Sequence, residues 1–166
     1  MSLLVGIISD THGLLRPEAA AALAGADHIV HAGDIGGPEI LAALRTIAPV
    51  TAVRGNNDRG AWTVAAALAD TEVLTLAGHT LYVLHDLAEL DLDPQVAGFA
   101  AVISGHSHKP ASTRRNGVLY FNPGSAGPRR FHLPIAVGRL HLPKNAGERG
   151  KEMTSEIVLL ESAIRR

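Results

Sequence analysis

The first third of the sequence alternates apolar runs with helix-like segments, and this order limits the fold more than any other feature. The apolar runs cover residues 3–8, 27–32 and 50–53. Helices are expected over 17–24 and 39–48, because Pro17 and Pro38 fit first helical turns and Gly25 is a common stop. Strands that alternate with helices in this way are typical of a parallel sheet with helical crossovers.

The pattern changes to hairpins after residue 70. Two pairs of strand-like runs each flank a short turn, and Asn116-Gly117 is the strongest hairpin signal in the chain. The pairs are 72–76 with 80–84 and 111–115 with 118–121. Further strands are expected over 100–103, 135–142 and 153–160, a short helix over 92–98, and a mobile polar loop over 143–152.

Hairpin strands after a parallel half indicate a second sheet. We therefore expect an α/β fold in which two mixed β-sheets pack as a sandwich with helices on the outer faces, a four-layer αββα arrangement. A length of 166 residues is enough for one domain with a sizeable core, so residues 1–166 are predicted to form a single domain.

Charge and composition exclude several classes of protein. The net charge of −1 gives no broad basic field for nucleic acid, although paired arginines could still form a local patch. The absence of cysteine excludes disulfides and thiolate metal sites. The N-terminal apolar run is short and meets Asp10 at once, and no run approaches the roughly 20 apolar residues of a membrane helix. We expect a cytoplasmic protein without membrane contact.

Residues that can bind a divalent metal follow predicted strands at five points along the chain. They are Asp10 with His12, Asp34, Asn56, His85, and His106 with His108. Ligands of α/β folds bind where loops converge at the carboxyl ends of strands, so one shared site is expected. Two carboxylates, one amide and four imidazoles are too many for one tetrahedral ion and suit two adjacent ions. Paired divalent ions are used to hydrolyse phosphate esters.

The sequence spacing of two pairs of candidate ligands supports their binding in one pocket. Asp10 and His12 are two residues apart, as are His106 and His108. If each segment is extended, the side chains of a pair point to the same side and into one pocket.

Each remaining candidate also has a structural interpretation. Asp34 could be a helix N-cap or turn residue, Asn56 could belong to a simple Gly-Asn-Asn-Asp turn, and His85 could be a buried structural histidine. The hypothesis of a metal site rests on all five points occurring together, each at a strand end.

With these motifs the sequence resembles the calcineurin-like metallophosphoesterases, especially their small single-domain phosphodiesterase branch in bacteria and archaea. The likeness extends from Ile8 to Ser125 and beyond. The matching motifs are Asp10-Thr11-His12, Gly33-Asp34, Gly55-Asn56-Asn57-Asp58, the strand-end His85, Gly105-His106-Ser107-His108 and Asn122-Pro123-Gly124-Ser125.

The resemblance implies a role for each ligand. One ion would be held by Asp10, His12, Asp34 and His108, and the other by Asp34, Asn56, His85 and His106. Asp34 would bridge the ions together with a hydroxide that acts as the nucleophile. The residues expected to carry catalysis are Asp34, Asn56 and His106.

The resulting hypothesis is a dinuclear metal-dependent phosphodiesterase that acts on a small phosphodiester. Manganese is expected first, and iron, nickel, cobalt or zinc also suit these ligands. Two alternatives stay open, a non-catalytic metal-binding scaffold with the same fold and a nuclease, although nucleic acid is not an expected partner. The oligomeric state is not predicted.

Two positions depart from the family's usual pattern. Many members carry a histidine, thought to protonate the leaving group, where this chain has Asn57, which cannot act as an acid. A glycine commonly stands where this chain has Asp86, which we interpret as a turn residue, with orientation of a ligand imidazole as the alternative. Other candidates are Arg54, Asn57 and Arg129 for substrate contact, Asp58 and His132 as substitute acids, and His31 as a neighbour of the metal ligands.

Overall fold

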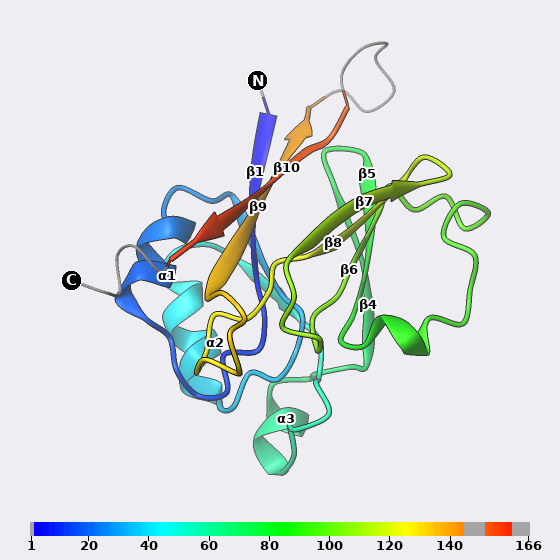
Figure 1. Ribbon diagram of the computed structural model, residues 1–166. Coiled ribbons are helices and arrows are strands. Elements are labelled where there is room, and N and C mark those ends of the chain that lie inside the picture. Colours follow the sequence, from blue (N-terminus) through cyan, green and yellow to red (C-terminus); the bar gives the residue numbers. More distant parts are fainter. Residues whose placement is uncertain (1, 145–151, 161–166) are drawn as a thin grey trace.

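The computed structural model describes residues 2–144 and 152–160, and this part of the chain forms two mixed five-stranded sheets (Figure 1). The first sheet has the order β10-β9-β1-β2-β3. Strands β1, β2 and β3 are parallel, and β9 and β10 continue the sheet in antiparallel fashion. Their bounds are β1 Ser2–Ile8, β2 His28–His31, β3 Val50–Ala52, β9 Ala136–Pro143 and β10 Thr154–Leu159.

The second sheet has the order β4-β5-β6-β8-β7. Strands β5, β6 and β8 are parallel in its centre, and the two predicted hairpins place β4 and β7 antiparallel at its edges. Their bounds are β4 Thr71–Leu76, β5 His79–Leu84, β6 Ala101–Ile103, β7 Ala111–Arg115 and β8 Val118–Asn122. The predicted sandwich of two mixed sheets is confirmed.

The main core lies between the sheets. Ile7 and Val30 of the first sheet pack in one cluster with Val83, Ile103 and Phe121 of the second, and none of these side chains is more than 1% exposed. Each such aliphatic or aromatic side chain stabilises the fold by about 1.5–3 kcal/mol. This packing fixes the two sheets, and with them the loops at their ends.

The outer faces differ in their cover. Helices α1 (Pro17–Leu23) and α2 (Pro38–Arg45) pack Leu23, Leu41 and Leu44 against the first sheet, as their apolar spacing predicts. In the described part of the chain, the short 3₁₀ helix η1 (Leu87–Glu89) and a turn region cover Tyr82 and Leu84 on the outer face of the second sheet. The helical layer is therefore well developed on one face alone (Figure 1).

One local prediction was wrong, and one helix was not predicted. The expected helix over 92–98 is only a single turn. The Asp93 carboxylate accepts the backbone N–H groups of Gln95 and Val96 as a helix N-cap does, but Gly98 takes a left-handed conformation (φ 80°) and ends the turn. Helix α3 (Ala61–Ala65) was not predicted. The loop predicted over 143–152 lies mostly outside the described residues.

The topology brings several strand ends together. Strand β1 runs from the top of Figure 1 toward the bottom, and β2 and β3 run parallel to it. The loops that follow β1, β2, β3, β5 and β6 carry the predicted ligands. Among the helices of residues 2–144 and 152–160, none has the length and apolarity to cross a membrane.

Candidate metal centre

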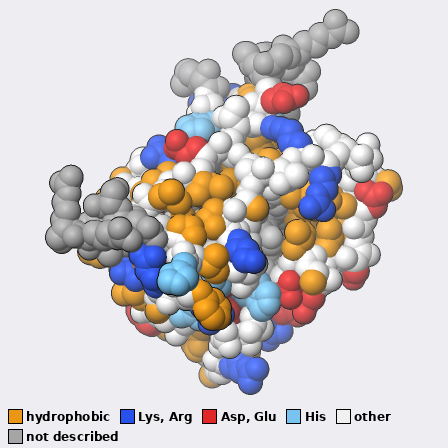
Figure 2. Space-filling model, viewed as in Figure 1, with side chains coloured by type: hydrophobic (Ala, Val, Ile, Leu, Met, Phe, Trp, Pro, Cys, Tyr) orange, Lys and Arg blue, Asp and Glu red, His pale blue; other side chains and the backbone are white. Residues whose placement is uncertain are grey.

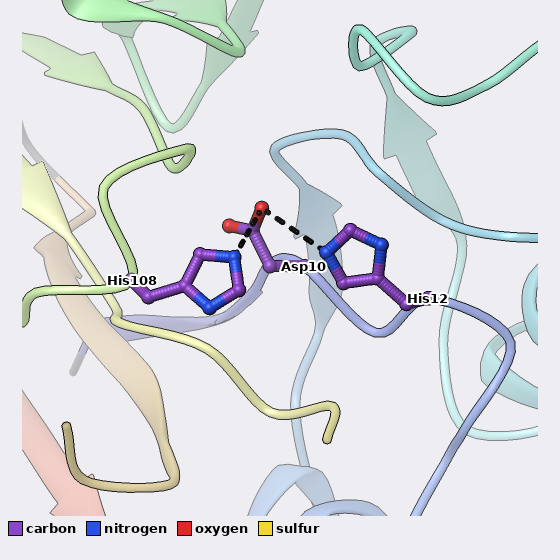
Figure 3. Close-up of side chains that lie close together, drawn as sticks. All are labelled: Asp10, His12 and His108. Atoms are coloured by element: carbon purple, nitrogen blue, oxygen red, sulfur yellow. Dashed lines mark ion pairs between the residues drawn. The ribbon is translucent and has the colours of Figure 1, made fainter. Parts of the chain in front are cut away.

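Two buried carboxylates form the middle of the site. The Oδ1 atom of Asp10 lies 3.3 Å from His108 Nε2 and 3.9 Å from His12 Nε2, so both imidazoles point at one oxygen (Figure 3). The Oδ2 atom of Asp34 lies 3.3 Å from His85 Nε2 and 3.7 Å from His12 Nε2. These contacts define two overlapping groups, Asp10 with His12 and His108, and Asp10 with Asp34 and His85.

The donor atoms fit divalent cations. Ligand atoms bound about 2.1 Å from one ion stand roughly 3.0–3.4 Å apart at right or tetrahedral angles, and the nitrogen–oxygen distances here run from 3.3 to 3.9 Å. Both Asp10 Oδ1 and His12 Nε2 are buried and have no hydrogen-bond partner. Buried polar atoms are costly without a partner, and a cation between these two would satisfy both.

Asn56 and His106 extend the cluster toward solvent. His106 Nδ1 lies 3.2 Å from Asn56 Oδ1 and 3.3 Å from His85 Nε2. The structure thus brings all seven predicted ligands together, although they come from five separate loops.

Neighbouring groups orient two of the imidazoles. His85 Nδ1 lies 2.7 Å from the Ala32 carbonyl and donates to it, which turns Nε2 toward the carboxylates. His106 turns Nε2 toward Asp86 Oδ2 at 3.7 Å, while Asp86 Oδ1 accepts the Ala88 N–H at 3.0 Å. Asp86 is therefore a turn residue, as predicted, and it also faces a ligand imidazole.

The ligand loops use left-handed backbone conformations. Nine non-glycine residues in the described part of the chain have positive φ, and five of them are predicted ligands. A non-glycine residue in this conformation costs roughly 1–2 kcal/mol relative to an ordinary backbone conformation. Residues with such strain are concentrated at functional sites. The five are Asp10 (φ 55°), His12 (47°), Asp34 (55°), His106 (68°) and His108 (61°).

The expectation that the two ligand pairs lie on extended backbone is therefore wrong. Both pairs reach the pocket through tight turns, because the chain must reverse direction directly after β1 and β6.

Glycines let the ligand loops touch one another. A Cβ on Gly55 would lie 2.1 Å from the Asp34 backbone nitrogen, and one on Gly105 would lie 2.0 Å from Ser9 Oγ and 2.7 Å from Asp10 Oδ2. Real Cβ atoms do not come so close to other atoms. The glycine that precedes each ligand in these two motifs is thus required by backbone packing.

The electrostatic environment keeps both carboxylates ionised. Burial alone would raise the pKa of Asp10, but the neighbouring His108 imidazole and the Ser9 hydroxyl outweigh burial and lower it. Burial likewise opposes ionisation of Asp34, and its hydrogen bond with His85 contributes most to holding its pKa well below the ordinary value. Ionised carboxylates are the form that binds metal.

The metal-free site also perturbs His85. Burial would lower the pKa of His85, yet its hydrogen bond with Asp34 and the charge of Asp10 raise it. The carboxylates thus attract positive charge to this position, either a proton or a metal ion.

Asn57 contacts Asp34 directly. Its backbone N–H donates to Asp34 Oδ1 at 2.8 Å, and its side-chain amide donates to Asp34 Oδ2 at 3.0 Å. Sequence reasoning predicted a substrate contact for Asn57 and did not foresee this role, for which the motif carries no signal.

The other predicted contacts lie around the centre. Arg54 forms an ion pair with Asp70 at 2.7 Å and lines a cavity of about 370 Å³ together with Asn56 and His106. Arg129 is exposed in the segment between β8 and β9, and substrate contact by either arginine stays a prediction.

Asp58 and His31 have structural roles. The Asp58 carboxylate accepts backbone N–H groups of Ile35, Gly36 and Gly55 at 2.8–3.1 Å, which ties the loop after β2 to the loop after β3. These hydrogen bonds occupy the Asp58 carboxylate. They argue against Asp58 as the general acid that protonates the leaving group.

His31 is completely buried beside the ligand loops. Its Nδ1 accepts the Gly33 N–H at 3.1 Å, so Nε2 carries the proton and donates to Thr11 Oγ1 at 2.9 Å. The Thr11 hydroxyl in turn donates to the Ile35 carbonyl at 2.7 Å. Burial lowers the pKa of His31 to about 4, so the imidazole is neutral near neutral pH. His31 thus braces the loops after β1 and β2.

Comparison with known proteins shows the family of this chain. The family model for the calcineurin-like phosphoesterase superfamily domain matches residues 3–145. The chain belongs to the calcineurin-like phosphoesterase superfamily. One superfamily relative is a probable metallophosphoesterase of Methanothermobacter thermautotrophicus, 37% identical over 94% of this chain and 92% of that protein.

Solved structures of other proteins share the fold. An archaeal phosphodiesterase superposes with a TM-score of 0.72 and 20% identity over 94% of this chain and 100% of that one. Vps29 from Entamoeba histolytica, in complex with Zn²⁺, superposes with a TM-score of 0.69 and 22% identity over 95% and 99% of the two chains. At these identities the likeness concerns the fold alone.

Proposed function

We propose that the protein is a metal-dependent phosphodiesterase with two divalent ions at this centre. The observation that carries the proposal is the position of Asp34, whose Oδ2 atom faces His12 on one side and His85 on the other. A carboxylate in that position suits a bridge between two ions. The superfamily membership supports phosphate ester hydrolysis as the reaction class.

The seven predicted ligands divide between the two ions. Asp10, His12 and His108 would hold one ion, Asn56, His85 and His106 the other, and Asp34 both. Manganese is proposed first, and iron, nickel, cobalt and zinc also suit oxygen and imidazole ligands. When bound, the ions would polarise the phosphoryl oxygens and lower the pKa of a water molecule to supply the nucleophile.

The chain's own residues hold this arrangement in place. Asn57 fixes the orientation of Asp34, and the Ala32 carbonyl and Asp86 orient His85 and His106. Oriented ligands need no reorganisation during the reaction. Because Asn57 replaces the family's usual proton-donating histidine, the leaving group would depart without an acid from this position.

Charge favours a diester over a monoester. Two divalent ions carry four positive charges, and Asp10, Asp34 and a hydroxide would offset three of them. The remaining single charge matches a phosphodiester, which carries one negative charge, better than a monoester dianion. A small phosphodiester is therefore the proposed substrate.

The alternative is a non-catalytic metal-binding scaffold with the same fold. It is considered because Vps29, which has this fold, was solved in complex with Zn²⁺. A scaffold does not need paired sites with oriented ligands. All seven ligand positions here carry residues that bind metal, which supports the enzyme over the scaffold.

The proposal is tested by loading purified metal-free protein with manganese, iron, nickel, cobalt or zinc and assaying aryl phosphodiesters and monoesters. We expect hydrolysis of diesters in preference to monoesters, and its loss in Asn56→Ala and His106→Ala. His141→Asn, on β9 outside the ligand set, is the matched control. A protein that binds two ions but hydrolyses no ester with any metal is the scaffold.

A further inference from the structure

A groove on the outer face of the second sheet begins beside His106. Its volume is about 240 Å³, and we call it the side groove. His106 and Asp86 line both the side groove and the cavity over the metal centre, so the two spaces adjoin at these residues. The side groove is lined by Asp86, Leu87, His106, Lys109, Arg115 and Tyr120 among others.

The strand register gives the groove its direction. Ala111, Thr113 and Arg115 of β7 all line it, since alternate residues of a strand share one face. Tyr120 pairs with Thr113 and therefore lies on the same face. From Ala111, near the ligand loop, the groove extends for about 13 Å to Arg115, at about 3.3 Å per residue.

The groove combines an aromatic wall with positive charge. The Arg115 guanidinium lies 5.0 Å from the centre of the Tyr120 ring, and Leu87 adds apolar surface. Lys109 and Arg115 are exposed, and no carboxylate of the described residues pairs with either. The one acidic residue of the lining, Asp86, turns an oxygen toward His106. Figure 2 shows hydrophobic side chains beside Lys and Arg side chains over the second sheet.

We propose that the side groove binds one of the two organic groups of the phosphodiester, and that this group is an aromatic unit with a second negative charge, as in a nucleotide. The assignment rests on the proposed function, which places the scissile phosphate beside His106. An aromatic ring would lie against Tyr120 and Leu87, and the second anion near Arg115. The volume is below the roughly 300–1,000 Å³ of sites that enclose a whole ligand, so it suits one group of a substrate.

A binding experiment tests the groove without turnover. Adenosine 5′-monophosphate and adenosine are titrated into metal-free protein, and amide chemical shifts are recorded. We expect the monophosphate to shift the signals of β7 and β8, and to bind at least about fivefold more tightly than adenosine. Arg115→Ala and Lys109→Ala should each remove most of this difference.

The matched controls are Arg45→Ala on α2 and Lys144→Ala after β9, neither of which lines the groove. They should bind the monophosphate as the unmodified protein does. Unchanged binding in Arg115→Ala, or no shifts on β7 and β8, overturns the proposal.

A kinetic experiment separates this proposal from the proposed function. The manganese-loaded protein is given a dinucleotide with and without a 5′-phosphate, and methyl p-nitrophenyl phosphate as a small diester. We expect a higher kcat/KM for the phosphorylated dinucleotide, and loss of that advantage in Arg115→Ala and in Ala111→Trp, which fills the groove. Hydrolysis of the small diester should change little in either variant.

If the protein hydrolyses diesters without preference for the 5′-phosphate, the groove assignment is overturned and the proposed function stands. If it hydrolyses no diester, the proposed function fails. The titration then decides by itself whether the groove is a nucleotide site.

Discussion

The side-chain amide of Asn57 donates a hydrogen bond to Asp34 Oδ2 at 3.0 Å, the same oxygen that faces His12 and His85. The Asn57 backbone N–H donates to the other oxygen of the same carboxylate. A residue expected from sequence to touch substrate thus holds the central aspartate of the candidate metal centre.

Replacing Asn57 with leucine should weaken metal binding. Leucine has nearly the same size but cannot donate to Asp34, whereas the backbone hydrogen bond of residue 57 remains. Loss of a group that orients a metal ligand typically costs 10–100-fold in affinity. Titration of metal-free protein with manganese measures the effect, and circular dichroism checks that the fold is kept. An unchanged affinity would show that the amide does not position Asp34.

The rate should depend strongly on the acidity of the leaving group, because Asn57 donates no proton. General acid catalysis is worth about 10²–10⁴-fold in rate, so diesters of acidic phenols should react far faster than diesters of alkyl alcohols. The measurement is kcat/KM across a series of aryl and alkyl phosphodiesters. A rate that is independent of leaving-group pKa would contradict the absence of an acid.

Backbone strain at His12 predicts an unusual effect of glycine. Glycine normally destabilises a protein relative to alanine, but the φ of 47° at this position favours glycine. We expect metal-free His12→Gly to be more stable than His12→Ala by about 1 kcal/mol. Urea unfolding of both variants provides the comparison. If His12→Ala is instead the more stable variant, residue 12 does not keep the left-handed backbone conformation in the folded protein.

The buried neutral His31 should make stability fall in mild acid. Its pKa is lowered from 6.5 to about 4, so below pH 6.5 the unfolded chain binds a proton that the folded chain does not. Stability from this residue is therefore present above pH 6.5 and is lost as the pH falls toward 4, by about 3 kcal/mol.

The measurement compares urea unfolding of metal-free protein and His31→Gln between pH 4.5 and 7. The pKa of His28 is also lowered by burial, but His28 is present in both proteins and cancels in the difference. Asp10 and Asp34 lose their stabilising charge only at lower pH, since their pKa values are below the ordinary range. Parallel stability curves for the two proteins would exclude the role given to His31.

The sequence could predict the strand ends that carry Asp10, Asp34 and His85, because apolar runs that stop at a glycine or a polar residue mark both the strand and its boundary. It could not predict the left-handed turns at His12 and His108, which depend on contacts between loops distant in the chain. The bonds from Asn57 to Asp34 likewise join loops 23 residues apart and leave no local pattern.

Failure at 92–98 has a local cause. Asp93 begins a turn as a helix N-cap does, but Gly98 takes a left-handed conformation and ends it after one turn, which is too short for a stable helix.

Anomalous scattering from crystals grown with manganese is the most direct test of the central claim, which is a pair of ions bridged by Asp34. We predict two peaks on either side of the Asp34 carboxylate, each within about 2.3 Å of one of its oxygens, with Asp10 and His12 beside one peak and His85 and His106 beside the other. A single peak away from Asp34, or no peak at all in fully loaded crystals, would contradict the account.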